Sequence, residues 1–254
     1  MAARPHRGTG RTWVHTALEV ASRFVLDLRV GPRTLETACE LVATVAICCW
    51  KKLPLLLIDE HLPYPAAILQ VFGLIKHRRR KNGRGRKKRP ALKPPPSLLV
   101  GVVKKIRNAK GKLLDVWTYA LFGRLKDIKH RIRRLGIGKT INTSHLERLN
   151  GTLRSQQTRL ARRTRNGSRM SCCLQWALWL WRDLYNWTRV HGSLKSRTPA
   201  MVLGLAKKVW SVLEYVRYPT HVSDLQRHYW AEQRKDVLES ALEKYQRKKT
   251  VPIS

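Results

Sequence analysis

Acidic residues are scarce in this sequence of 254 residues. Only 16 Asp and Glu stand against 52 Lys and Arg, which gives a formal net charge of +36 at pH 7. This imbalance argues against an ordinary enzyme of small metabolites and favours a nucleic-acid partner. Because 43% of the residues are hydrophobic, the chain can still bury the core of one large or two small domains.

Long hydrophobic runs are also absent. The two longest, residues 41–50 and 53–58, are shorter than the roughly 18 residues needed to cross a bilayer. The basic N-terminus is not followed by the apolar segment and cleavage site of a secretory signal. We therefore expect a cytoplasmic, nucleoid-associated protein without a membrane partner.

Cysteines are few, and the sequence lacks other catalytic motifs. The five cysteines form no C-x-x-C pair, which argues against zinc and a disulfide framework and favours buried thiols. The segment 136–140 resembles the end of a phosphate-binding loop, but Arg133 replaces the required glycine. No arrangement of Ser, Cys or His suggests a nucleophile with its base.

Hydrophobic patterning predicts an α/β fold. The expected strands are residues 12–20 and 23–30 in one hairpin, 53–58 as a strand buried on both faces, and 98–105 and 112–121 in a second hairpin turned at 108–111. The expected helices are residues 33–50, 65–72, 124–135, 171–190 and 227–248, and a long helix that follows residues 142–144 and reaches about residue 165.

A basic segment interrupts this pattern at residues 76–97. Nearly all of its charges are positive, and it ends in three consecutive prolines. A solvated charge run would explain the composition, but a single sign of charge favours phosphate contacts. The residues that we expect to make them are Arg78, Arg79, Arg80, Lys87 and Lys88.

Two helices carry informative stripes. In the helix after residues 142–144, one stripe is apolar, and a neighbouring stripe containing Glu147, Asn150 and Arg154 should face outward. In the helix from residue 171, aromatic and aliphatic residues recur at helical spacing, which is typical of packing rather than of base stacking. The residues expected to pack there are Trp176, Leu180, Leu184 and Trp187.

Two carboxylates stand at positions where catalytic sites are built. Asp59 ends the expected strand 53–58, and Glu147 lies in the first turn of the helix after residues 142–144. Each has a purely structural alternative: Asp59 as a turn residue, and Glu147 as the partner of Ser144 in a capping box. A catalytic role would require several carboxylates to converge on a divalent metal ion.

One segment resembles the catalytic-helix signature of DDE transposases of the insertion-sequence-one type. It runs from Asn142 to Asn150 and is followed by Leu153, Arg154 and residues 159–164. Further similar fragments occur in the same order: residues 30–34, Ile58-Asp59-Glu60 with Tyr64, and residues 184–186, 189–194, 198–201 and 209–211. The resemblance covers roughly residues 12–215.

The resemblance implies a ribonuclease-H-like mixed sheet flanked by helices, with a basic insertion and a helical C-terminal part. In that family two aspartates and a glutamate hold two Mg²⁺ (or Mn²⁺) ions for DNA cleavage and strand transfer. Asp59 matches the second aspartate and Glu147 the glutamate, both as catalytic residues and as metal ligands. Residues implied to contact DNA are Arg148, Asn150, Arg154, Arg159, Arg162, Arg163 and Arg165.

The implied organisation starts with a basic N-terminal remnant, residues 1–11. The core is implied at residues 12–75 and 98–190, on either side of the 76–97 insertion, and a helical extension at 191–254. Family members usually act as homo-oligomers on element ends and target DNA.

The sequence departs from the family pattern at the first aspartate. Residues 1–12 contain no acidic residue, and Glu19 and Asp27 do not match the required position. We therefore expect a chain that is incomplete at its N-terminus, either decayed or normally joined to an upstream reading frame by frameshifting. Alone, it should bind DNA without cutting it. The alternatives are a nonenzymatic DNA-binding remnant or regulator, and an unrelated basic nucleic-acid-binding protein.

Overall fold

The computed structural model describes residues 12–49, 52–76, 90–160, 167–168 and 170–218. The chain divides into two compact units, each built from two separate segments. Unit 1 comprises Met1–Leu41 and Ser144–Val212, and unit 2 comprises Val42–Thr143 and Leu213–Ser254. Helices α1 (Leu35–Cys48) and α7 (Val212–Arg217) run across the boundaries.

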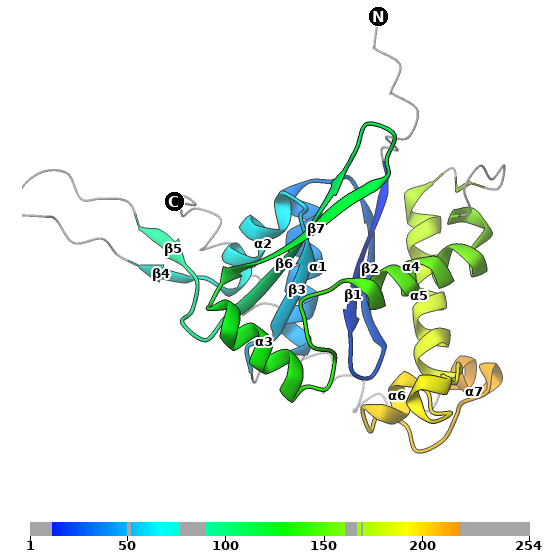
Figure 1. Ribbon diagram of the computed structural model, residues 1–254. Coiled ribbons are helices and arrows are strands. Elements are labelled where there is room, and N and C mark those ends of the chain that lie inside the picture. Colours follow the sequence, from blue (N-terminus) through cyan, green and yellow to red (C-terminus); the bar gives the residue numbers. More distant parts are fainter. Residues whose placement is uncertain (1–11, 50–51, 77–89, 161–166, 169, 219–254) are drawn as a thin grey trace, which may run out of the picture. The chain divides into compact units, whose positions relative to one another are not determined.

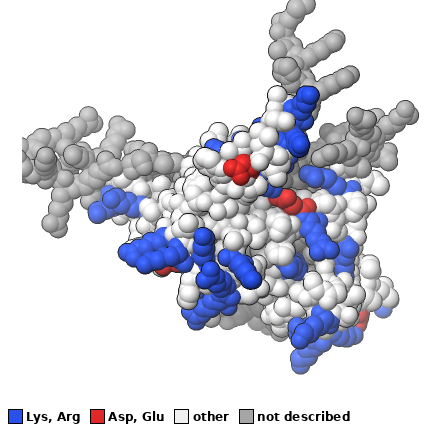
Figure 2. Space-filling view, in the orientation of Figure 1, with Lys and Arg blue, Asp and Glu red and all other residues white. Residues whose placement is uncertain are grey.

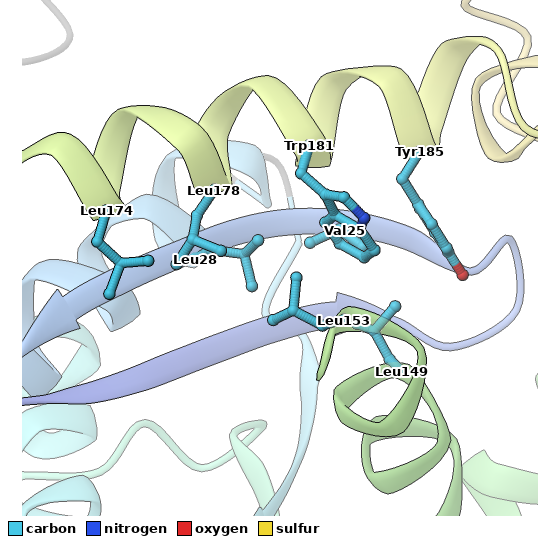
Figure 3. Packing of buried hydrophobic residues seen from close by; sticks show 8 residues of the cluster. All are labelled: Val25, Leu28, Leu149, Leu153, Leu174, Leu178, Trp181 and Tyr185. Carbon is cyan, nitrogen blue, oxygen red and sulfur yellow. The ribbon is translucent and has the colours of Figure 1, made fainter. Parts of the chain in front are cut away.

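Unit 1 is built on an antiparallel hairpin of β1 (Trp13–Glu19) and β2 (Phe24–Gly31), as the sequence predicts. Helices α4 (Ser144–Gln156) and α5 (Ser171–Trp187) pack against it. The shorter elements are the 3₁₀ helices η1 (Thr158–Leu160) and η2 (Gly192–Leu194) and the helix α6 (Pro199–Val202). Side chains from β2, α4 and α5 meet in one core cluster (Figure 3).

Helix α5 contributes four buried side chains to this cluster, spaced three or four residues apart. They are Leu174, Leu178, Trp181 and Tyr185, and they point from α5 toward the hairpin. Val25 and Leu28 of β2, and Leu149 and Leu153 of α4, complete the cluster. The packing stripe predicted from the sequence is therefore half wrong. Leu184 is half-buried and the Trp187 ring centre lies 4.7 Å from that of Trp210, but Trp176 and Leu180 are 62% and 52% exposed. These two residues lie about 200° around the helix from Leu174 and Leu178, on the opposite face.

A polar stripe lies one residue further along α5 and binds the outer edge of β2. The Asn186 amide accepts a hydrogen bond from the Val25 N–H (2.9 Å) and donates one to the Val25 carbonyl (2.9 Å). Gln175 pairs in the same way with the Val30 N–H (2.8 Å) and the Leu28 carbonyl (2.6 Å). Two amide side chains thus satisfy backbone groups that a further strand would otherwise pair.

Asp27, 1% exposed, completes this polar layer. Its carboxylate accepts hydrogen bonds from Trp179 of α5 (3.2 Å) and from the Arg29 guanidinium (2.7 Å). The Arg182 guanidinium lies 3.7 Å away. A buried carboxylate with this many partners stabilises the packing of α5 on β2, because its charge is compensated.

Unit 2 contains a mixed three-stranded sheet in the order β3 (Leu55–Asp59), β6 (Leu99–Arg107), β7 (Leu113–Phe122). Strands β3 and β6 are parallel, whereas β6 and β7 form the predicted antiparallel hairpin. Its turn contains Gly111 with φ +80°, a backbone conformation that favours glycine. The predicted burial of β3 on both faces is wrong, because β3 is half-buried at a sheet edge and β6 is the central strand.

Two helices cover parts of unit 2. Ile128 and Ile132 of α3 (Leu125–Arg134) pack with Val103 of β6 and Ile141. Helix α2 (Pro63–Phe72) places Leu69 against Leu92 of β5 (Ala91–Lys93). Strand β5 pairs with β4 (Leu74–Lys76) in a short ribbon that projects from unit 2 (Figure 1). The protein is therefore a mixed α/β fold with a mixed sheet flanked by helices, as predicted.

The cysteines and the C-terminal helix were further expectations from the sequence. Only Cys39 is buried among the five cysteines, so the prediction of buried thiols holds for that residue alone. The predicted helix at 227–248 lies outside the described residues. Within the described ranges, no helix is both long and apolar enough to span a bilayer.

The two faces of α5 can be compared by one substitution made at two positions. We expect Leu178→Ala to lower the free energy of unfolding by about 2–5 kcal/mol, because it opens a cavity in the unit 1 core. Leu180→Ala, on the exposed face, should cost less than about 1 kcal/mol. Urea unfolding of the full chain measures both, and equal losses would contradict this assignment of the buried face.

Candidate nucleic-acid interface

Helix α4 places its two stripes as the sequence predicts, except that Asn150, expected to face outward, is half-buried. Leu149 and Leu153 are buried in the unit 1 core, while Glu147 and Arg154 are exposed. Arg148 is exposed as well. A carboxylate and two guanidinium groups therefore lie on the solvent side of a helix whose other side is fixed by packing.

Helix α4 begins where the sequence predicts but ends earlier than predicted. The helix begins at Ser144, so Ser144 and Glu147 share its first turn. It ends at Gln156, where the chain continues into η1, rather than near residue 165. The side-chain oxygen of Gln156 accepts a hydrogen bond from the Trp181 indole (2.8 Å), which holds the end of α4 against α5.

Asn150 and Arg159, both implied DNA contacts, have partners within unit 1. The Asn150 side-chain oxygen accepts a hydrogen bond from the Thr16 hydroxyl of β1 (3.3 Å). The exposed Arg159 guanidinium donates to the Ser168 hydroxyl (3.3 Å) and the Cys173 carbonyl (3.4 Å). Both side chains therefore help to hold α4 and the segment that follows it in place.

Asp59 lies at the carboxyl end of β3 in unit 2 and is exposed. Its neighbour Glu60 forms an exposed ion pair with Lys104 of β6 (2.7 Å), which raises the pKa of Lys104. Asp59 belongs to unit 2 and Glu147 to unit 1. The location of Asp59 at a strand end agrees with the expectation from the sequence.

Two divalent ions, as the resemblance implies, need several carboxylates close together. Among the described residues, no group of three His, Cys, Asp or Glu side chains could hold a metal ion. The Asp27 carboxylate is bound by the side chains around it, and that of Glu19 accepts hydrogen bonds from the backbone of Ala21 and Ser22 (3.1 and 2.6 Å). No metal-dependent step therefore follows from the described side chains.

The remaining predicted DNA contacts lie outside the described residues. They are Arg78, Arg79, Arg80, Lys87, Lys88, Arg162, Arg163 and Arg165. The first five belong to the segment that connects β4 to β5, and β5 itself lies within the predicted insertion 76–97.

Helix α3 forms a basic surface that was not among the residues predicted to contact DNA. Ile128 and Ile132 are fully buried, and the rest of the helix carries cations with Asp127 as its one acidic residue. The cationic residues of this helix and its N-cap are Arg124, Lys126, Lys129, Arg131, Arg133 and Arg134. Lys and Arg side chains are also widespread, and Asp and Glu few, on the face of the molecule in Figure 2. The signal in the sequence is a pair of isoleucines four residues apart among basic residues.

A helix with one buried apolar edge and several exposed cations is suited to phosphate contacts, because its charges are held in a fixed array.

Comparisons of this chain with protein-family models, with curated proteins and with solved structures found no match.

Proposed function

We propose that this chain is a DNA-binding protein related to DDE transposases of the insertion-sequence-one type, with a ribonuclease-H-like core. The observation that carries the DNA-binding proposal is the exposed cationic face of α3, in a chain of net charge +36. An excess of fixed cations binds the DNA backbone by releasing condensed counterions. Phosphate contacts of this kind supply affinity without reading sequence.

The order of elements supports the kinship with transposases. Asp59 is the last residue of a strand that pairs in parallel with β6, and Glu147 lies on the exposed side of a later helix. Both are positions that the resemblance assigns to metal ligands. Two carboxylates are fewer than the three that hold two Mg²⁺ or Mn²⁺ ions in the family, so we propose that this chain alone binds DNA without cutting it.

The alternative, an unrelated basic nucleic-acid-binding protein, differs in one respect that can be measured. A relative of transposases should prefer the repeats that flank its own gene over random duplexes of equal length. Measured at one salt concentration, equal affinity for both would favour the unrelated binder.

The contribution of α3 can be measured through the salt dependence of binding. The triple substitution K126Q/R133Q/R134Q removes three charges, so the slope of log K against log salt should fall by about 2 to 3. The charge-conserving control K126R/R133K/R134K should leave the slope within about 1 of the original. Fluorescence anisotropy with a labelled duplex gives both slopes. An unchanged slope in the first variant would exclude α3 from the interface.

Cleavage is tested on supercoiled plasmid with Mg²⁺ or Mn²⁺. We expect the purified chain to leave the plasmid supercoiled under conditions in which it is fully bound. Glu147→Gln, which removes one implied ligand, should behave identically in this assay. Metal-dependent nicking by the original chain that disappears in Glu147→Gln would contradict the proposal of an inactive chain.

A further inference from the structure

The turn that joins β1 to β2 holds an arginine in a backbone conformation that arginine rarely adopts. Arg23 has φ +62°, in the left-handed region that favours glycine and asparagine. Glu19 fixes the turn by accepting hydrogen bonds from the Ala21 and Ser22 backbone and from the Ser22 hydroxyl. The strained position therefore carries a large cationic side chain where a small residue would fit better.

Three buried nitrogen atoms in this part of unit 1 have no hydrogen-bond partner within the described structure. They are Nη1 of Arg23, Nη1 of Arg189 and Nε2 of His191. The side chains lie around Tyr185: the Arg189 guanidinium carbon is 5.7 Å from the centre of its ring, and the His191 ring centre is 4.8 Å away. The charge of Arg23 acts on both groups: it helps to lower the pKa of His191 and opposes the burial that raises the pKa of Tyr185.

The electrostatics of this cluster favour a bound anion. Burial, and then the charges of Arg189 and Arg23, lower the pKa of His191. Burial also lowers the pKa of Arg23; Tyr185 and Glu19 oppose this effect, and Arg148 of α4 adds to it. The cations therefore repel one another, and the Glu19 carboxylate is already bound to the turn.

A purely structural role would resemble the arrangement of the other arginines of unit 1. Arg29 and Arg182 lie 2.7 and 3.7 Å from the Asp27 carboxylate, which compensates their charge. Arg23 and Arg189 instead each leave a buried guanidinium nitrogen unsatisfied, a costly arrangement unless a ligand completes it. Both side chains, and that of His191, are half-buried, so each residue borders solvent.

We propose that Arg23, Arg189 and His191 form a phosphate-binding site, which holds a backbone phosphodiester of bound DNA. Guanidinium and imidazole N–H groups are the donors that phosphate oxygens prefer. The identity of the ligand as DNA rests on the proposed function, whereas the affinity for phosphate does not. The exposed Arg148 of α4, which acts electrostatically on Arg23, supplies a further cation nearby.

The test uses Arg23→Asn, with Lys195→Asn as its matched control. Asparagine tolerates the left-handed conformation, and Lys195 has φ +55°, is exposed and lies in the same unit. Each variant therefore loses one charge at a similar backbone position. Arg23→Asn should keep or raise the Tm of the chain, because it removes a strained, unsatisfied cation.

Binding is followed by NMR of the full chain with ¹³C-labelled histidine, in which His191→Gln identifies the His191 signal. Inorganic phosphate added in a chloride background should shift the His191 signal saturably and raise its pKa, because a neighbouring anion favours the imidazolium. Arg23→Asn should abolish this shift, and Lys195→Asn should retain it. A duplex of DNA should produce the same shift, and Arg23→Asn should weaken duplex binding about tenfold, against less than about threefold for Lys195→Asn.

Four results would contradict the inference, a part of it, or the proposed function on which the identity of the ligand rests. No saturable shift with phosphate, or an equal shift in Arg23→Asn, would exclude the phosphate site. A phosphate shift combined with a duplex that binds but leaves His191 unchanged would exclude DNA as the source of the phosphate. A chain that binds phosphate at His191 but does not bind duplex would refute the proposed function while leaving the site itself supported.

Discussion

The arrangement of unit 1 depends on how α5 binds the outer edge of β2. Gln175 and Asn186 are eleven residues apart, close to three helical turns, so their amides lie on one side of α5 and pair with the β2 backbone. This pairing fixes the rotation of the helix about its own axis. The apolar stripe from Leu174 to Tyr185 then faces the hairpin, and Trp176 and Leu180 face away from it.

The same pairing positions two groups of side chains in unit 1: those on the exposed side of α4, and the cluster around Tyr185. Leu149 and Leu153 of α4 enter the core that α5 completes, which leaves Glu147 and Arg154 on the exposed side. Asn186, at Val25, also brings the end of α5 close to the β1–β2 turn, so Tyr185 lies near Arg23. The proposed phosphate site and the exposed side of α4 that carries Glu147 and Arg154 thus both depend on one helix–strand contact.

Local patterns in the sequence predict most of the elements. Both long hairpins, α1, α2 and α3 occur where hydrophobic periodicity and turn residues indicate them, and Asp59 ends a strand as expected. The buried face of α5 was assigned wrongly because tryptophan and leucine occur on all its sides, so apolar spacing alone does not identify one face. The discriminating signal was polar: Gln175 and Asn186 lie on the face that meets the strand edge.

Other features depend on residues far apart in the sequence and could not be predicted. Whether β3 is central or at an edge depends on pairing with β6, not on its own apolar run. The cluster around Tyr185 joins a turn near the N-terminus with residues after α5, and no motif marks Arg23 as part of it. The basic character of α3 was visible, but its value as an interface follows from the burial of Ile128 and Ile132.

Amide hydrogen exchange at Val25 and Val30 tests the central contact most directly. Both amides lie on the edge of β2 that no other described strand covers, yet each donates to a side-chain amide of α5. We expect them to exchange as slowly as amides in the unit 1 core, and Asn186→Ala to accelerate Val25 far more than Val30. Rapid exchange of both amides in the unmodified chain, at the rate of an open sheet edge, would show that α5 is not bound to β2 as described.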